Sequence, residues 1–192
     1  ITEGKRGFSI IGNMNAITYK QAFPLLKDNK MWIGPSINSG DREFEVPSAS
    51  KTRSSSLRAA DGKKFLHVDG VRWFTNIEHG KRHLPIPLMT MEENIKFSKH
   101  KELRGSNYQE YDNYDAIEVP FTDAIPSDYR GVMGVPISFM NKYSPEQFEI
   151  VGLAAGNIRG LSGMVSKTGK DGPYIGGKLK YGRVMIQHRR PQ

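Results

Sequence analysis

The clearest pattern of apolar and polar positions lies at residues 7–34. An apolar run over residues 8–11 predicts a buried strand, and Gly12 and Asn13 predict a sharp turn after it. A second short apolar run at residues 30–33 predicts another strand, which ends at Gly34-Pro35. The intervening residues should therefore connect two strands of one domain.

A helix is expected in that connection. Thr18 and Gln21 have the spacing of a capping box, so the helix should begin at Thr18 and continue to residues 28–29. Pro24 lacks a backbone donor and should kink or restart it. The strand, helix, strand order is typical of an α/β domain, which binds ligands at the carboxyl ends of its strands. Asn13 and Asn15 would lie at that edge.

The next segment predicts strands and a basic loop. Residues 42–46 alternate like a half-exposed strand, and residues 47–60 form a Ser-rich basic loop that is either solvated or ordered by a phosphate backbone. Residues 63–68 and 71–77 read as two strands joined by an Asp-Gly hairpin turn. Trp73 and Phe74 point to opposite faces of the second strand, so one is expected in the core and the other on a stacking surface.

The remaining residues predict a mixed α and β region. Thr90 and Glu93 form a second capping box, so a short helix should follow. Strands are expected at residues 115–119, 132–135, 148–153 and 180–187, with a helical turn at 136–143. We divide the chain into a strand–helix–strand unit at 1–35, a core hairpin with recognition insertions at 36–115, and an α+β region with a basic tail at 116–192.

Composition narrows the possible partners. The 192 residues carry a net charge of +8 and contain no cysteine. The basic excess favours an anionic partner, most often nucleic acid. The lack of cysteine excludes disulfides and thiolate metal sites and favours an intracellular protein. No apolar run approaches the ~20 residues of a membrane span. His79 and His83 lie in a basic turn without an acidic partner, so we expect no metal site.

Four ordered blocks of sequence carry a family resemblance. They are FSIIGNMNAITYKQAFPLLKDNKMWIG, VRWFTNIEHGKRH, YDNYDAIEV and IPSDYRGVMGVPISFMNKYSPEQFEIVGL, which together span residues 8–153. The chain resembles the EcoRI-type adenine-specific DNA methyltransferases. The resemblance implies an α/β fold with a partial Rossmann-like methyltransferase sheet and a mixed α+β target-recognition region. It also implies methyl transfer from S-adenosylmethionine to the N6 of adenine in double-stranded DNA.

Two motifs of such enzymes are missing from the chain. The sequence contains neither an F-x-G-x-G cofactor turn nor an N-P-P-F or D-P-P-Y tetrapeptide, and it has no Pro-Pro pair. In the family both motifs precede the block that begins here. Because the chain also starts almost directly with a strand pattern, we expect it to be the C-terminal portion of a longer protein. Catalytic residues and S-adenosylmethionine binding are then expected upstream of Ile1, in the missing N-terminal methyltransferase segment, and the chain alone should be inactive.

The resemblance assigns roles to residues by position. Asn13, Trp73 and Phe74 are expected to line the pocket for the target base, which such enzymes extrude from the duplex. Cations and amides near the strands are candidates for phosphate contacts or groove readout. This DNA-binding set comprises Asn38, Arg42, Arg53, Arg58, Arg72, Lys81, Arg82 and His83.

Two other functions stay open at this point. The chain could be a non-catalytic DNA-binding module that kept the methyltransferase scaffold, or an RNA-binding or RNA-modifying protein that prefers single strands. The Gly-rich segment GLAAGNIRGLSG lacks the spacing of a cofactor loop and is interpreted as an ordinary loop. For the methyltransferase we expect a cytoplasmic protein of bacterial or phage origin, with no membrane or metal partner.

Overall fold

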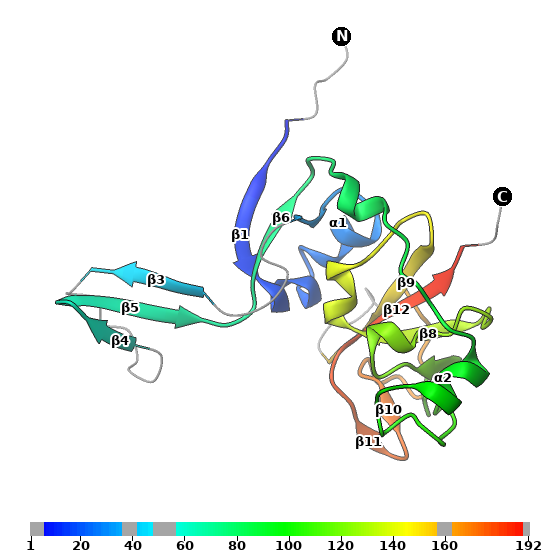
Figure 1. Ribbon diagram of the computed structural model, residues 1–192. Helices are drawn as coiled ribbons and strands as arrows, with labels where there is room; N and C mark the ends of the chain where they lie inside the picture. Colours follow the sequence, from blue (N-terminus) through cyan, green and yellow to red (C-terminus); the bar gives the residue numbers. More distant parts are fainter. Residues whose placement is uncertain (1–5, 36–41, 48–56, 157–162, 190–192) are drawn as a thin grey trace, which may run out of the picture.

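The computed structural model describes residues 6–35, 42–47, 57–156 and 163–189, and Figure 1 shows their arrangement. These residues form four small sheets and several short helices, which are joined by loops. The two α-helices are α1 (Phe23–Lys27) and α2 (Met91–Phe97). Four 3-10 helices accompany them: η1 (Met14–Thr18), η3 (Gly80–His83), η4 (Thr122–Ala124) and η5 (Ile137–Asn141).

The first sheet has the strand order β1-β6-β2. Its strands are β1 (Ser9–Asn13), β6 (Val71–Thr75) and β2 (Trp32–Ile33). Both β1 and β2 are antiparallel to β6, so they run parallel to each other. The chain between them forms η1 and α1. The unit is therefore a strand–helix–strand crossover into which a third, antiparallel strand has been inserted.

The first strand is not buried as the sequence predicted. Ile10 is 57% exposed and Ile11 is 49% exposed, although successive residues of a strand point to opposite faces. Both faces of β1 are therefore only partly covered by the described residues. The apolar pattern was correct for a strand, but burial depends on neighbours that the local sequence does not reveal.

The predicted helix start at Thr18 is wrong. The Thr18 hydroxyl donates to the Asn15 carbonyl at 2.8 Å, which closes the η1 turn and uses the group that a capping box would need. Helix α1 begins at Phe23, with Pro24 in its first turn. Proline has a suitable φ there and needs no donor, so it restarts the helix, one of the two outcomes that the sequence allowed. The second capping box is confirmed, because Thr90 and Glu93 exchange both bonds at the start of α2.

A three-stranded sheet forms an arm that projects from the rest of the protein (Figure 1). We use "the arm" for β3 (Arg42–Val46), β5 (Lys63–Val68) and β4 (Leu57–Ala60), in the order β3-β5-β4. The predicted hairpin at Asp69-Gly70 is wrong, because β5 pairs within the arm whereas β6 pairs with β1 and β2. The hairpin lies instead at Asp61 and Gly62, which join β4 to β5. Both have positive φ, as a type I′ turn requires.

The largest sheet contains the C-terminal strands and much of the core. Its order is β7-β8-β12-β9, and it comprises β7 (Ala116–Glu118), β8 (Val132–Pro136), β12 (Arg183–His188) and β9 (Phe148–Ala154). Only β7 and β8 are parallel. A small hairpin, β10 (Tyr174–Ile175) with β11 (Lys178–Leu179), precedes β12. Buried Met133, Val135 and Leu153 belong to a core that also includes residues of α1 and the first sheet.

A buried ion pair supports this sheet. Arg183 Nη2 donates to Glu118 Oε1 at 2.5 Å, and Tyr111 donates its hydroxyl to the same carboxylate. Glu118 is 7% exposed, so the hydrogen bonds that satisfy its charge matter for stability. The pair links β7 to β12 across β8.

The mixed α and β content agrees with the predicted fold class at that coarse level. A Rossmann-like sheet is not confirmed, because the described sheets are small and mostly antiparallel. Among the residues described, no helix is long and apolar enough to span a bilayer. The same residues contain no group of three or more potential metal ligands.

Candidate functional site

Asn13 stands at the carboxyl end of β1, where the sequence placed a ligand-facing group. Its Oδ1 accepts from the Asn15 backbone N–H at 2.9 Å, and its Nδ2 donates to the Asp69 carbonyl at 2.8 Å. Asn13 therefore caps η1 and ties it to the residues that lead into β6. The side chain is still exposed, so it lies at a sheet edge that solvent can reach.

Arg72 and Asn141 lie beside this sheet edge, toward the interior of the protein. Arg72 pairs with Gly12 in the ladder and is only 5% exposed. Its Nε donates to Asn141 Oδ1 at 2.9 Å, and its Nη1 donates to the Val71 carbonyl. Burial and then the nearby charge of Arg42 lower the pKa of Arg72. The two guanidinium groups therefore lie close enough to repel each other.

The two aromatic residues of β6 divide as their alternation predicted. Phe74 is 5% exposed and belongs to the core. A Cβ on Gly12 would lie 3.0 Å from the Phe74 ring, which shows how closely β1 packs on it. Trp73 lies on the opposite face and is only partly buried. Phe74 is therefore not placed to stack on a base, whereas Trp73 keeps accessible surface.

Arg82 was expected to contact phosphate, but the structure gives it internal partners. It is 8% exposed and donates to Glu78 and to the Asn29 side chain, both at 2.8 Å. Its guanidinium lies 3.9 Å from the centre of the Trp32 ring. Such cation–π and charge-assisted contacts stabilise a fold. We therefore assign Arg82 a structural role.

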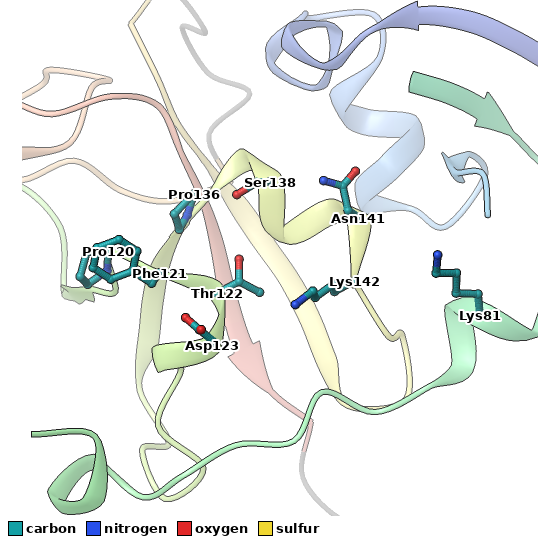
Figure 2. Close-up of a pocket in the computed structure, with 9 residues that line it drawn as sticks. All are labelled: Lys81, Pro120, Phe121, Thr122, Asp123, Pro136, Ser138, Asn141 and Lys142. Atoms are coloured by element: carbon teal, nitrogen blue, oxygen red, sulfur yellow. The ribbon is translucent and has the colours of Figure 1, made fainter. Parts of the chain in front are cut away.

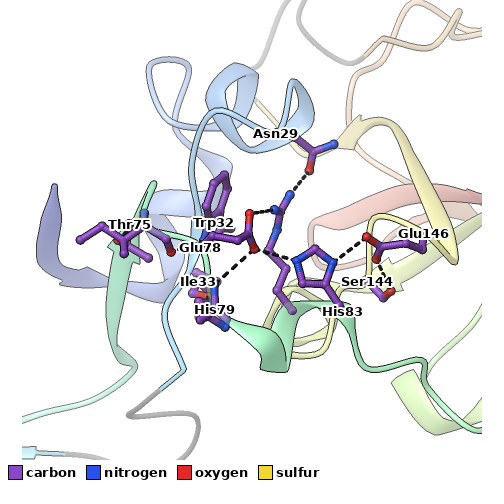
Figure 3. Close-up of polar contacts among 11 residues, drawn as sticks. Asn29, Trp32, Ile33, Thr75, Glu78, His79, His83, Ser144 and Glu146 are labelled. Carbon is purple, nitrogen blue, oxygen red and sulfur yellow. Dashed lines mark hydrogen bonds and ion pairs between the residues drawn. The ribbon is translucent and has the colours of Figure 1, made fainter. Parts of the chain in front are cut away.

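His83 bridges two carboxylates in the same cluster (Figure 3). Its Nδ1 lies 2.6 Å from Glu146, and its Nε2 lies 2.8 Å from Glu78. Hydrogen bonds to Glu146 and then to Glu78 raise the pKa of His83. The imidazolium joins η3 to the turn before β9, so His83 also has internal partners.

Lys81 lines a pocket with a volume of about 390 Å³ (Figure 2). Figure 2 shows Lys81 and Lys142 on one side of this space and Pro120 with Phe121 on the other. The remaining lining residues are Thr122, Asp123, Pro136, Ser138 and Asn141. Asp123 contributes little negative charge to the pocket, because Lys99 and His100 contact its carboxylate at 2.6 and 2.8 Å. Two lysines and two hydroxyls suit a phosphate group.

This pocket adjoins the sheet edge through Asn141. The Asn141 amide accepts from Arg72, and its Nδ2 lies 3.9 Å from the Met14 sulfur, just after Asn13 in the chain. Asn141 and Lys142 were not predicted as site residues: both lie in the fourth block of the family resemblance, but nothing in their local sequence indicates a chemical role. Only the packing of η5 on η1 brings them to the edge.

Two further predicted DNA contacts, Arg42 and Arg58, belong to the arm. Arg42 is exposed on β3, and Arg58 on β4 forms an ion pair with Glu43 at 2.9 Å. Asn38 and Arg53 lie outside the described residues. The predicted set is therefore divided between the arm, the sheet edge, the pocket that Lys81 lines and the ion-pair cluster around Glu78.

Comparisons with known proteins extend over nearly the whole chain. The family model described as "Adenine-specific methyltransferase EcoRI" matches residues 1–189. The chain is 37% identical to the Type II methyltransferase M.EcoRI of Escherichia coli, over 96% of this chain and 51% of that protein. It is 33% identical to M.MpnI of Mycoplasma pneumoniae, over 98% of this chain and 59% of that protein.

The chain thus spans between half and three-fifths of the length of these curated relatives. The sequence placed the catalytic residues upstream of Ile1, and that placement stays a prediction. No solved structure matches the chain. The family model and the two relatives agree with the blocks noted in the sequence. The chain belongs to the family of EcoRI-type adenine-specific methyltransferases.

Proposed function

We propose that this chain is the C-terminal part of an S-adenosylmethionine-dependent DNA methyltransferase that modifies the N6 of adenine. Its contribution would be DNA binding and one wall of the target-base pocket. The observation that carries the proposal is strand β1, which has isoleucines on both faces, both about half exposed. A strand of that kind is typical of the interior of an α/β sheet, where helices cover both faces.

The missing cover would come from the remaining part of a larger methyltransferase sheet. β1 has one neighbour, β6, among the described strands, so its other edge can accept a further strand. The relatives are nearly twice as long as this chain, which leaves enough residues for such a half-sheet. Asn13 would then lie near the middle of the completed sheet edge, where α/β proteins bind ligands.

The residues of this chain do not fit the methyl donor. The sequence has no F-x-G-x-G turn, and it has no Pro-Pro tetrapeptide to hold the adenine amino group. We therefore assign cofactor binding and chemistry to the other part of the protein, upstream of Ile1. The residues here would position DNA instead.

DNA would approach along the exposed cations beside the edge. Lys81 and Lys142 line the pocket, and Arg42 lies at the base of the arm. Phosphate contacts of this type fix the register of a protein on the duplex. Trp73 would form part of the base pocket, where stacking is worth ~1–3 kcal/mol. A 2-aminopurine signal that is unchanged by Trp73→Ala in the longer protein would remove Trp73 from this role.

Transfer of a tritiated methyl group to DNA tests which part of the protein carries out the chemistry. The longer protein that carries this chain should methylate duplex DNA at adenine, and the 192 residues alone should show no turnover. Turnover by the chain alone would refute the assignment of chemistry to the other part. A longer protein that binds duplex DNA but never methylates it would favour a non-catalytic binding module.

A further inference from the structure

The hairpin of β10 and β11 carries a basic stretch that the proposed function does not use. Residues 163–182, which include the hairpin, contain four lysines and one acidic residue, so the segment has a net charge of +3. Lys178 begins β11, and Lys180 follows it. Both side chains are exposed, and neither ammonium group has a hydrogen bond or an ion pair with the residues that the structure describes.

The other charged residues of this segment have partners within the protein. Lys167 forms an ion pair with Asp115 at 2.5 Å, and the Lys170 ammonium lies 4.7 Å from the centre of the Tyr174 ring. Asp171 is partly buried, and its backbone carbonyl accepts from a buried tyrosine. The two lysines on and after β11 are therefore the cations of this segment that are left for an external partner.

Hydrogen bonds from the preceding loop fix the shape of the hairpin. Gly176 and Gly177 have positive φ, as a type I′ turn requires, and their N–H groups donate to the Asp112 carboxylate at 3.0 and 2.7 Å. The buried Asn113 side chain accepts from the Tyr174 N–H at 3.1 Å and donates to two backbone carbonyls just before β10. A surface element held in this way loses less conformational freedom when it binds a partner.

The hairpin leads directly to the sheet edge that carries Asn13. A Cβ on Gly182 would lie 3.9 Å from the methyl carbon of Thr18, the last residue of η1, and η1 itself follows Asn13. Tyr181, which is 88% exposed, stands between Lys180 and this contact. In Figure 1 the arm projects to the left and the hairpin lies at the lower edge of the body, so the hairpin is a separate part of the surface.

We propose that the hairpin binds the phosphate backbone of the duplex beside the target adenine, through Lys178, Lys180 and Tyr181. Ammonium groups and tyrosine hydroxyls both donate to phosphate oxygens. Asp112 is a positioning residue, because it holds the turn that precedes Lys178. This inference rests on the proposed function. Since phosphate contacts orient a protein without reading sequence, their loss should weaken specific and non-specific duplex binding by similar factors.

Two double variants that remove the same charge test the contact. In the longer protein that carries this chain, duplex affinity is measured across a range of salt for Lys178→Gln with Lys180→Gln, and for Lys30→Gln with Lys96→Gln. Lys30 and Lys96 already have carboxylate partners at 3.2 and 2.5 Å. The hairpin variant should lower the slope of log K against log salt by about two units, one for each phosphate contact. The control variant should leave the slope unchanged.

Asp112→Ala distinguishes a fixed hairpin from attraction by net charge. This change makes the protein more positive, so net charge alone would strengthen DNA binding. We expect a severalfold loss of affinity instead, because the turn at Gly176 and Gly177 loses its acceptor. Asp115→Ala is the control: it removes an exposed carboxylate of the same loop that does not contact the turn, and it should not lower affinity.

Other outcomes would overturn the inference in distinguishable ways. Equal slopes for the two double variants, with normal duplex binding by the unaltered protein, refute the hairpin contact alone. Undiminished affinity of Asp112→Ala refutes its positioning role. Absence of any duplex affinity in the unaltered protein refutes the proposed function as well. Sedimentation that shows a dimer, dissociated by the hairpin variant, would assign the two lysines to an acidic surface of a second copy of the chain.

Discussion

At the scale of single residues, charge alone did not reveal which cations are available to a ligand. The sequence grouped Arg72, Lys81, Arg82 and His83 as DNA contacts. The structure buries Arg72 and Arg82 against protein groups and leaves Lys81 exposed beside a pocket. The division of Trp73 and Phe74 between two faces was predictable, because it follows from strand alternation. Which arginine finds Glu78 or Asn141 depends on contacts between distant segments.

His83 provides a pH-dependent prediction at this scale. Its pKa is raised in the folded protein by hydrogen bonds to Glu146 and Glu78. The stabilisation is thus complete below the unfolded pKa of about 6.5 and is lost as the pH rises through the folded value. His83→Gln should lower the thermal midpoint at pH 6 and lower it much less at pH 9. Calorimetry at both pH values checks this.

The matched control is His67→Gln, on the exposed arm, where His67 contacts Asp69 two residues further along the chain. It should lower the midpoint less than His83→Gln at pH 6. A His83→Gln deficit of equal size at pH 6 and pH 9 would show that the ring acts by packing and not by charge.

At the scale of elements, the sequence located most strands and the capped helix α2, because periodicity and capping are local signals. It misassigned the pairing of β5 with β6, because Asp-Gly at 61–62 and at 69–70 look alike locally. A tertiary contact distinguishes the two Asp-Gly turns. The Gly70 carbonyl accepts from the Met14 N–H at 2.7 Å, and this bond holds the start of β6 next to β1. Strand β4 was hidden in a segment whose composition resembles a loop.

The arm should be dispensable for folding of the body, which is a prediction about a whole element. Its strands pair only with one another among the described residues. β2 and β6 already meet beyond it, since the Gly34 N–H donates to the Trp73 carbonyl at 2.9 Å. Replacing residues 36–68 by a Gly/Asn linker of about six residues should close a hairpin there. The thermal midpoint of the chain should change by only a few degrees.

The same replacement in the longer protein should reduce binding to its own site toward non-specific affinity, a loss on the order of 10³-fold or more. The site can be identified by mapping methylated adenines in DNA from cells that express the protein. Full site-specific affinity without the arm would contradict its role in DNA binding. Collapse of the midpoint would show that the arm supports the fold.

At the scale of the whole molecule, β1 offers the decisive comparison between this chain and the longer protein. Ile11 is 49% exposed here but should be buried once further strands and helices cover β1. Ile11→Lys should therefore change the unfolding free energy of the chain by no more than about 0.5 kcal/mol, as surface substitutions usually do. In the longer protein the same change buries an unpaired ammonium and should cost several kcal/mol. Urea unfolding of both proteins measures the difference in unfolding free energy.

Leu84→Lys, at a position that is 62% exposed, is the control and should be mild in both proteins. If Ile11→Lys is equally mild in the longer protein, β1 is an outer strand there too, and the proposed sheet does not continue beyond it.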